Sequence, residues 1–352
     1  MEEPLKALTF HGKQTIKYES VSAPEIKTSK DVIVKVLLSA ICGSDLHVYH
    51  EREIGLDYGT VMGHEFVGEI VEVGKEVKSF SEGDIVFSPF TTNCGECFFC
   101  RKGLTARCSQ GQLFGWVENG VGLHGGQAEY VRVPLADSTL LRLPEDVSQE
   151  EGLLLGDIFS TGYFCADMAE ISLDGTYTVV GCGPVGLLAI LGALESGAEN
   201  IYAIDSIPER LELARSFGAN PINYQHDNPV EMLREVTDGR GADAILEVVG
   251  SALAARLAFD LVRPGGIIST VGVHTEKVIA FSPVEAYNKN ITYKIGRCSA
   301  RHYMERLLPV VRAKKYDLTA VITHRLPLSE GVRGYEIFDK KVDSCIKVVL
   351  KP

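Results

Sequence analysis

Apolar residues follow two different patterns along the 352-residue chain. From Lys6 to about Pro144, short runs alternate apolar and polar residues and are interrupted by glycine, as in 31–40, 65–74 and 83–90. Alternation with a period of two, bounded by glycine, is typical of half-buried strands. The first part of the chain is therefore predicted to be an all-β region.

After Glu150, apolar strands alternate with helical segments. Strands are predicted near Thr178–Val180, Ile201–Ile204, Pro221–Tyr224, Ala244–Val249, Ile267–Val271 and Ile291–Ile295. Helices are predicted at Pro184–Ser196, Pro208–Phe217, Pro229–Thr237 and Ser251–Val262. This alternation implies a doubly wound parallel sheet with both faces covered, so the fold class is α/β. The segment after Cys298 adds a helix, Tyr303–Ala313, and a strand, Cys345–Leu350, without a change of composition that would mark a third domain.

The chain is acidic overall. With 35 Lys and Arg against 47 Asp and Glu, its formal net charge is −12, and its hydrophobic share of 45% is ordinary for a globular protein. Such a charge repels phosphate backbones and anionic lipids, so we expect neither a nucleic-acid partner nor a membrane-surface function. The length exceeds what one hydrophobic core usually serves, so two domains are expected.

The N-terminal stretch MEEPLKALTFHGK lacks the basic start and apolar core of a secretory signal, so we expect a cytoplasmic protein. The uncharged stretch 175–194 is long enough to span a bilayer, but its glycines and proline favour a strand, loop and helix of a soluble core. In a reducing compartment, the nine cysteines are expected to serve a metal or redox site rather than disulfides.

A glycine-rich run follows the predicted strand that ends at Val180. It has the form G-x-G-x-x-G, opens a predicted helix, and consists of Gly181, Cys182, Gly183, Pro184, Val185 and Gly186. The glycines permit a tight turn and a close approach of the backbone to a pyrophosphate, which binds at the positive N-terminus of the helix. This context predicts a dinucleotide-binding Rossmann domain; a structural glycine turn that binds nothing is the alternative.

The next predicted strand ends in Asp205, at about the 20-residue distance that the motif requires. Its carboxylate is expected to accept hydrogen bonds from the adenosine ribose hydroxyls. A carboxylate there also repels the extra phosphate of NADP, so NAD is the predicted cofactor. Arg210, in the following helix, is within reach of the same ribose, and a solvated helix face is the alternative for it.

Four cysteines lie close together in a glycine-rich segment. Cys94, Cys97, Cys100 and Cys108 have the spacing C-x2-C-x2-C-x7-C. Four thiolates in one short lobe suit tetrahedral zinc with no open position, which is a structural site. An iron–sulfur cluster is the alternative, but no proline follows the last cysteine and no second run of this kind occurs. We therefore predict a structural zinc.

Three further residues of metal-binding type are spread along the chain: Cys42 in ICGSDLH, His64 in MGHE and Asp157 in LLLGDIFSTGY. Each has a simpler interpretation when taken alone. Cys42 can be a small buried apolar residue, His64 a surface or hydrogen-bonded core histidine, and Asp157 a helix cap. Their spacing does not join them into one site.

The GHE box, the four-cysteine lobe and the glycine fingerprint, in this order, resemble the zinc-containing medium-chain alcohol dehydrogenase family over essentially the whole chain. The resemblance implies a GroES-like β catalytic domain, residues 1–155 and 297–352, around a Rossmann NAD-binding domain, residues 156–296. It also implies that Cys42, His64 and Asp157 bind a catalytic zinc, which gives two zinc ions per chain.

Asp157 departs from the most familiar form of the family, which has a cysteine at this position. The departure is shared with glutathione-independent formaldehyde dehydrogenases and with microbial secondary-alcohol dehydrogenases. Zinc accepts carboxylate oxygen, so the site is expected to persist. The substrate range of the primary-alcohol enzymes is not carried over to this chain.

The resemblance also gives expected roles to residues around the zinc. Glu65 is placed beside the metal or as a transient ligand, and Asp45 is placed to hydrogen-bond His64 and raise its basicity. An ordinary buried pairing is the alternative for both acids. Ser44 and His47 match the proton relay of the family.

Other matching positions concern the cofactor and the substrate. Thr161 and Val273 match positions beside the nicotinamide, and Lys347 matches a basic residue on the cofactor pyrophosphate, with a surface lysine as its alternative. Phe90 and Trp116 are candidates for the substrate pocket, with plain core packing as the alternative for either.

The resemblance implies an NAD(H)-dependent, zinc-dependent alcohol dehydrogenase that acts on a small alcohol or aldehyde, with secondary alcohols and sugar alcohols left open. The alternatives are a formaldehyde dehydrogenase or dismutase with tightly held cofactor, a polyol dehydrogenase, and an inactive nucleotide-binding paralogue. The joint presence of the expected site residues argues against the inactive paralogue and against a zinc-free quinone reductase. By resemblance, a homodimer or homotetramer is expected.

Overall fold

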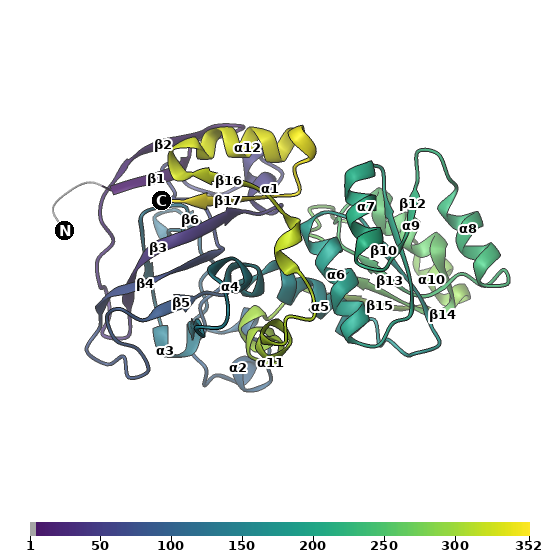
Figure 1. Ribbon diagram of the computed structural model, residues 1–352, viewed down its shortest axis with the longest axis horizontal. Coiled ribbons are helices and arrows are strands. Elements are labelled where there is room, and N and C mark those ends of the chain that lie inside the picture. Colours follow the sequence, from purple (N-terminus) through teal and green to yellow (C-terminus); the bar gives the residue numbers. More distant parts are fainter. Residues whose placement is uncertain (1–4) are drawn as a thin grey trace. The chain divides into compact units, whose positions relative to one another are not determined.

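The computed structural model describes residues 5–352, so the first four residues of the N-terminal stretch considered above lie outside it. The chain divides into two compact units. One unit runs to Asp157 and resumes at Ser299–Pro352, and the other is the inserted segment Ile158–Cys298. In Figure 1, the yellow C-terminal elements therefore belong with the purple and blue N-terminal strands.

The first unit is built on a seven-stranded sheet with the order β16-β17-β3-β4-β5-β9, in which β8 also pairs with β3. Its strands are β3 (Val32–Ile41), β4 (Phe66–Val73), β5 (Ile85–Phe87), β8 (Tyr130–Val133), β9 (Leu141–Arg142), β16 (Ile322–Pro327) and β17 (Lys347–Lys351). Two-stranded sheets are formed by β1 (Leu5–Phe10) with β2 (Ile16–Val21), and by β6 (Trp116–Glu118) with β7 (Val121–Leu123). Strand β17 runs antiparallel to β3, so the C-terminal segment completes the N-terminal sheet.

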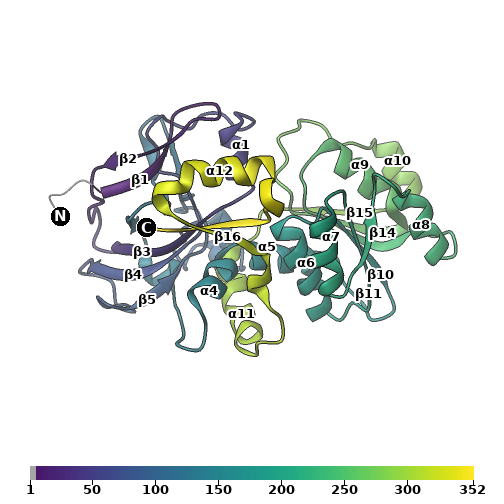
Figure 2. The same ribbon diagram turned by 45° about the horizontal axis from the view of Figure 1, so that its top comes forward.

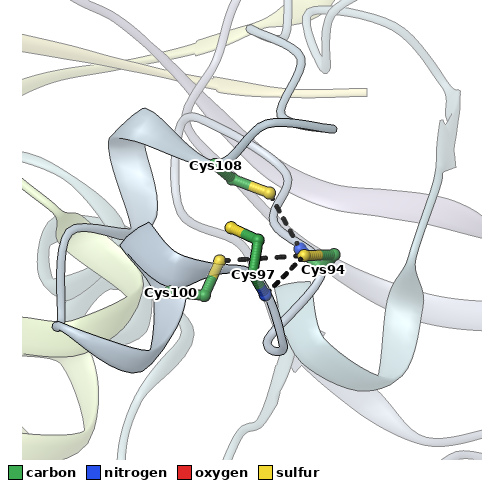
Figure 3. Close-up of side chains that lie close together, drawn as sticks. All are labelled: Cys94, Cys97, Cys100 and Cys108. Atoms are coloured by element: carbon green, nitrogen blue, oxygen red, sulfur yellow. Dashed lines mark hydrogen bonds between the residues drawn. The ribbon is translucent and has the colours of Figure 1, made fainter.

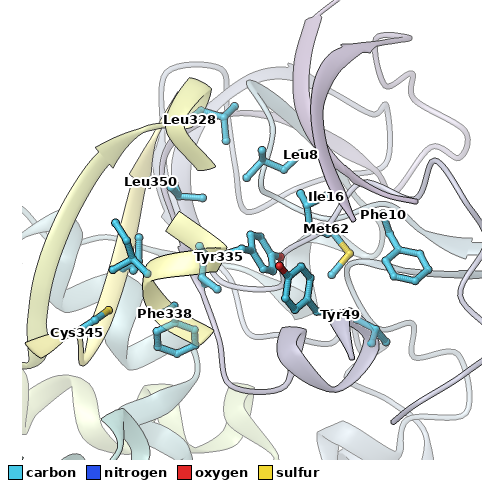
Figure 4. Packing of buried hydrophobic residues seen from close by; sticks show 14 of the residues in the cluster. Leu8, Phe10, Ile16, Tyr49, Met62, Leu328, Tyr335, Phe338, Cys345 and Leu350 are labelled. Carbon is cyan, nitrogen blue, oxygen red and sulfur yellow. The ribbon is translucent and has the colours of Figure 1, made fainter. Parts of the chain in front are cut away.

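Helices also occur in the first unit. They are α1 (Asp45–Tyr49), α2 (Phe98–Arg101), α3 (Ala136–Thr139), α4 (Gln149–Gly156), α11 (Ala300–Arg312) and α12 (Gly331–Lys340). The prediction of an all-β region up to Pro144 was wrong at α1, α2 and α3, because helices of four or five residues are too short to show a helical period. Helix α12 was not predicted either; it covers an apolar cluster that includes Leu8 and Met62 (Figure 4).

The second unit is a six-stranded parallel sheet with the order β12-β11-β10-β13-β14-β15. The strands are β10 (Thr176–Val180), β11 (Asn200–Asp205), β12 (Asn220–Asn223), β13 (Ala242–Glu247), β14 (Val262–Thr270) and β15 (Thr292–Ile295). The helices are α5 (Ile158–Met168), α6 (Pro184–Glu195), α7 (Pro208–Ser216), α8 (Pro229–Val236), α9 (Ala252–Leu261) and α10 (Pro283–Lys289). The predicted doubly wound parallel sheet is confirmed, and Figure 2 shows its helices from a second direction.

Strand order reverses beside β10, because the chain moves from β10 to β11 and β12 on one side and later returns to β13 on the other. In sheets of this kind, ligands bind outside the carboxyl ends of the strands at the point of reversal. The uncharged stretch 175–194 forms β10, the glycine-rich loop and α6 at this point. Within residues 5–352, no helix combines the length and the apolar character that crossing a membrane requires.

Candidate metal and dinucleotide sites

The four cysteines between β5 and β6 gather into one cluster. The sulfur atoms of Cys94, Cys97, Cys100 and Cys108 all lie within 4.8 Å of one another, and Figure 3 shows the side chains pointing toward a common centre. The Sγ atoms of Cys94 and Cys100 are 4.0 Å apart. Four sulfurs around zinc, with Zn–S bonds of about 2.3 Å, are separated by roughly 3.8 Å, whereas a disulfide needs about 2.05 Å. The spacing fits a tetrahedral metal site.

Backbone amides point at the sulfurs of this cluster. The amide of Cys94 lies 3.2 Å from the Sγ of Cys108, and that of Cys97 lies 3.4 Å from the Sγ of Cys94. Backbone hydrogen bonds from Cys100 and Ser109 lower the pKa of Cys97 to about 5. Amide donors stabilise thiolates, which are the form that binds metal. Burial and the neighbouring sulfurs, by contrast, raise the pKa of Cys100 to about 12 and also raise the pKa of Cys108. The amides therefore favour the thiolate at Cys97, and the other crowded sulfurs need a cation to become thiolates.

A second group of metal-binding side chains is buried in the same unit. Cys42 follows β3, His64 and Glu65 precede β4, and Asp157 joins α4 to α5. One ligand atom of each residue lies within 4.8 Å of those of the others. Asp157 Oδ2 is 3.8 Å from Cys42 Sγ and 3.4 Å from His64 Nε2. The structure thus brings together three residues that sequence spacing alone did not join, and Glu65 lies beside them, as the resemblance implied.

The donor set of this group fits zinc, which binds thiolate, imidazole nitrogen and carboxylate oxygen. Burial, together with the Asp157 carboxylate, raises the pKa of Glu65 and the pKa of Cys42. Glu65 Oε2 is buried and has no hydrogen-bond partner within the described part of the chain. Crowded acidic groups with an unsatisfied buried oxygen are what a divalent cation would balance.

Lys347, at the start of β17, has a partner that the sequence did not predict. It is fully buried, and its Nζ lies 2.6 Å from Glu65 Oε1. Burial opposes the charged ammonium, but the Glu65 carboxylate raises the pKa of Lys347. The predicted contact of Lys347 with the cofactor pyrophosphate stays a prediction, and the structure adds an ion pair beside the candidate metal site.

Both ring nitrogens of His64 contact polar side chains. Its Nδ1 lies 3.3 Å from Asp45 Oδ1, consistent with the expected hydrogen bond, and its Nε2 lies 3.2 Å from Ser44 Oγ. Burial alone would lower the pKa of His64, but the carboxylates of Asp45 and Asp157 raise it well above its usual value. The ring is therefore fixed with Nε2 toward Asp157.

The second residue of the predicted relay, His47, lies in α1 three residues after Ser44. Its Nδ1 is buried and has no hydrogen-bond partner among residues 5–352. Burial, Arg52 and His50 lower the pKa of His47, so the imidazole is neutral at pH 7 and able to accept a proton. The relay itself stays a prediction.

The two predicted pocket aromatics differ in their surroundings. Phe90 is 6% exposed, and its ring meets that of His64 edge to face with 6.4 Å between centroids. Trp116, on β6, packs with Leu46 against the apolar cluster that contains Met62. Phe90 therefore lies beside the candidate metal site, whereas Trp116 is at least partly a packing residue.

In the second unit, the glycine-rich loop joins β10 to α6. A Cβ at Gly186 would lie 1.8 Å from the carbonyl oxygen of Gly181, so the turn requires glycine there. Gly183 is the N-cap of α6 and provides no side-chain cap, and Pro184 follows it. The first amides of α6 are therefore open to an anion. The nearest side-chain atom to a Cβ at Gly183 would be a guanidinium nitrogen of Arg210, at 3.9 Å, so a second positive group faces this loop.

Asp205, at the end of β11, holds the same loop. Its Oδ2 accepts a hydrogen bond from the Cys182 amide at 2.8 Å, and its Oδ1 accepts from the amides of Ser206 and Ile207. The carboxylate is thus oriented at the carboxyl edge of the sheet. Thr161 lies in α5, and Val273 follows β14; both belong to this unit, and their nicotinamide contacts stay predictions.

A buried acid that was not predicted from the sequence lies at this edge. Glu247 ends β13 and is fully buried; its Oε1 accepts from the amides of Val249 and Gly250, both at 2.8 Å. Its Oε2 lies 3.1 Å from Nε2 of His274, next to Val273. Glu247 therefore joins the loops that follow β13 and β14. A lone acid inside the apolar run AILEVV was the available signal.

This pair is expected to make the two loops sensitive to pH. The Glu247 carboxylate raises the pKa of His274, so the stabilisation from charged His274 is complete below about pH 6.5 and is lost as pH rises through the folded-state pKa. Amide exchange at Val249 and Gly250, corrected for intrinsic rates, should therefore become faster over that range. His274→Gln should remove this dependence. An equal pH dependence in the variant and the parent would contradict the assignment.

Comparison with known proteins gives matches over both units. Residues 28–145 match the family model of the alcohol dehydrogenase GroES-like domain, and residues 184–313 match that of the zinc-binding dehydrogenase. Zinc-type alcohol dehydrogenase B of Aspergillus flavus is 45% identical over 346 residues, covering 96% of this chain and 79% of that protein.

Two further similarities concern an isopropanol dehydrogenase and a solved structure. The NADP-dependent isopropanol dehydrogenase of Thermoanaerobacter brockii is 36% identical over 315 residues, covering 88% of this chain and 87% of that protein. The structure of an alcohol dehydrogenase from Thermus sp. ATN1 matches with a TM-score of 0.92 at 39% identity, covering 98% of this chain and 99% of that one.

Proposed function

The chain belongs to the zinc-containing alcohol dehydrogenase family, and from this premise we propose that it is a zinc-dependent oxidoreductase that transfers a hydride between a small alcohol and NAD. The observation that carries the proposal is the buried group of Cys42, His64 and Asp157, with Glu65 beside it. A paralogue without chemistry would have no need to keep a sulfur, an imidazole and two carboxylates buried together.

Each part of the site has a task in this proposal. Cys42, His64 and Asp157 would hold zinc, which would act as a Lewis acid and lower the pKa of an alcohol, and NAD would be the hydride acceptor. The Ser44 hydroxyl, 3.2 Å from His64 Nε2, would accept the proton of the substrate while it passes its own proton on toward His47. Neutral His47 accepts that proton further along and releases it to water. Phe90 gives the site an apolar wall and excludes water from it.

The direct test is the metal content and activity of the purified chain. We expect two zinc ions per chain by mass spectrometry and reduction of NAD with small primary or secondary alcohols. One zinc and no turnover would favour the nucleotide-binding paralogue. Bound nicotinamide in the purified protein, with dismutation of formaldehyde, would favour the formaldehyde alternative.

The choice of NAD over NADP rests on Asp205, because an NADP-dependent enzyme is among the relatives. Asp205→Ala should weaken NAD binding and shift the ratio of kcat/KM for NADP to that for NAD by about 10²-fold, since a like-charge contact costs several kcal/mol. The measurement is steady-state kinetics with both cofactors.

Asp205→Asn is the matched control for this substitution. Its amide oxygen can still accept from Ser206 and Ile207, although its NH2 group cannot accept from the Cys182 amide, so two of the three contacts remain while the charge is removed. It should therefore shift the ratio in the same direction with less loss of stability. An unchanged ratio in both variants would assign cofactor choice to other residues.

We also propose that the chain forms a homo-oligomer. Strand β15 is an edge of the parallel sheet, and an exposed edge is a template for pairing with a second copy. On the neighbouring α10, Tyr287 is 85% exposed and Val284 is 67% exposed, so apolar surface that a second copy could cover lies near this edge. Sedimentation equilibrium would distinguish dimer, tetramer and monomer.

A further inference from the structure

We infer that Gln127 and Tyr335 are positioning residues for the candidate metal site, through a buried chain of hydrogen bonds that fixes Asp45 and, through it, His64. The inference rests on the proposed function, because it concerns the same metal site. It adds two residues that neither the sequence motifs nor the comparisons indicated. Gln127 and Tyr335 are fully buried, and Asp45 is 4% exposed, so water does not compete for these contacts.

The chain of hydrogen bonds starts at Tyr335 in α12. Its hydroxyl donates to Gln127 Oε1 at 2.8 Å, across 208 residues of sequence. Gln127 Nε2 donates to the carbonyl oxygen of Ala40 at 3.0 Å and to Asp45 Oδ2 at 3.2 Å. Asp45 Oδ2 also accepts from the Cys42 amide at 2.9 Å, and Asp45 Oδ1 faces His64 Nδ1.

The chemistry of the partners fixes the direction of each bond. The Ala40 carbonyl can only accept, so the nitrogen of the Gln127 amide must face it, and the oxygen must face Tyr335. Asp45 Oδ2 then accepts hydrogen bonds from Gln127 and from the Cys42 amide, and Asp45 Oδ1 lies 3.3 Å from His64 Nδ1, on the side where that nitrogen carries its proton. With Nδ1 held toward Asp45, Nε2 is the ring nitrogen that faces Asp157 and would bind a metal.

Packing holds the amide of Gln127 in place. Gly63, directly before His64, has φ 90°, and a Cβ there would lie 2.4 Å from Gln127 Cγ. The side chain of Gln127 thus rests against the backbone that carries His64. Its own backbone amide donates to the Met62 carbonyl at 2.9 Å. A rotation of Gln127 would therefore be transmitted to both Asp45 and His64.

Tyr335 lies in the apolar cluster shown in Figure 4, and the centroid of its ring is 5.5 Å from the centroid of the Tyr49 ring. Both tyrosines are buried members of this cluster, but only Tyr335 bonds to Gln127. Tyr335→Phe removes a hydroxyl that belongs to the hydrogen-bond chain. Tyr49→Phe removes a hydroxyl from the same apolar cluster that does not belong to the hydrogen-bond chain. The second variant is therefore a matched control for a general loss of packing.

The experiment uses Co²⁺-substituted protein and the metal-binding affinity of each variant. We expect Tyr335→Phe to weaken Co²⁺ binding at the Cys42–His64–Asp157 site by about tenfold and to shift its visible d–d bands, as partners of metal ligands typically account for 10- to 100-fold in affinity. Gln127→Met, which keeps the length but removes the amide, should weaken binding further. Tyr49→Phe should match the parent, and the four-cysteine cluster should keep its metal in all variants.

The outcomes separate this inference from the proposed function. If the parent binds two ions and Tyr335→Phe and Gln127→Met keep its affinity and spectrum, the inference is wrong and the function stands. Equal weakening in Tyr335→Phe and Tyr49→Phe would likewise overturn it, because packing would then be the cause. If the parent binds only the ion of the four-cysteine cluster, the proposed function fails, and the inference fails with it.

Discussion

Substituting Asp157 by alanine is expected to lower turnover by about 10³-fold or more, while NADH binding is retained. A Lewis acid supplies several kcal/mol of stabilisation to the developing charge, and about 1.4 kcal/mol corresponds to tenfold in rate. Loss of the carboxylate leaves Cys42 and His64, with Glu65 as the remaining carboxylate, and one of its oxygens is held by Lys347. The measurements are kcat, zinc per chain, and NADH binding by fluorescence titration.

NADH binding should persist because the glycine-rich loop and Asp205 belong to the other compact unit.

Two control variants test the role of Asp157 more closely. Asp157→Cys supplies another zinc-binding donor and should keep two zinc ions, whereas Asp157→Asn keeps the shape without the charge and should lose affinity. Full turnover of the alanine variant in the absence of zinc would show that the reaction does not use this site.

Removing one sulfur from the four-cysteine cluster is expected to have the largest effect on stability. Cys97→Ala should leave one zinc per chain and lower the melting temperature by about 10 °C, because structural zinc contributes on the order of 10 kcal/mol and a few kcal/mol moves the midpoint by several degrees. The lobe has short helices and a partly exposed cluster, so it has little apolar core to replace the metal. Calorimetry and metal analysis measure both quantities.

Cys345→Ala is the matched control, since Cys345 is a buried cysteine of the same unit that lies outside both metal-binding groups. It should keep two zinc ions and show only the smaller cost of a core cavity. If Cys97→Ala retained two zinc ions and the parent melting temperature, the cluster would not be a structural metal site.

Local features of the fold and site could be predicted from the sequence. The loop from Gly181 to Gly186 and the cluster from Cys94 to Cys108 are defined by short spacings, because each forms within one turn or one lobe. The strand and helix alternation likewise predicted the parallel sheet. In these cases the residues that interact are close in sequence.

Features that depend on tertiary contacts could not be predicted in this way. Asp157 and Cys42 are 115 residues apart, and only a family resemblance suggested that they meet. The contact between Gln127 and Tyr335 joins the loop between β7 and β8 to helix α12. In α12, charged residues alternate with apolar ones, so its sequence did not indicate a helix. Nothing in the local pattern around either residue specifies its partner, because the fold alone decides which buried donors and acceptors face each other.

The ion pair between Lys347 and Glu65 spans 282 residues, and the whole second unit is encoded between them. During synthesis, the segment Ile158–Cys298 emerges from the ribosome before β17 does, and domains generally fold as units while the chain is still growing. The first unit must therefore wait, with Glu65 unpaired and an edge of its sheet open at β3, until β17 arrives. Chaperone contact with the nascent chain should concentrate in this interval.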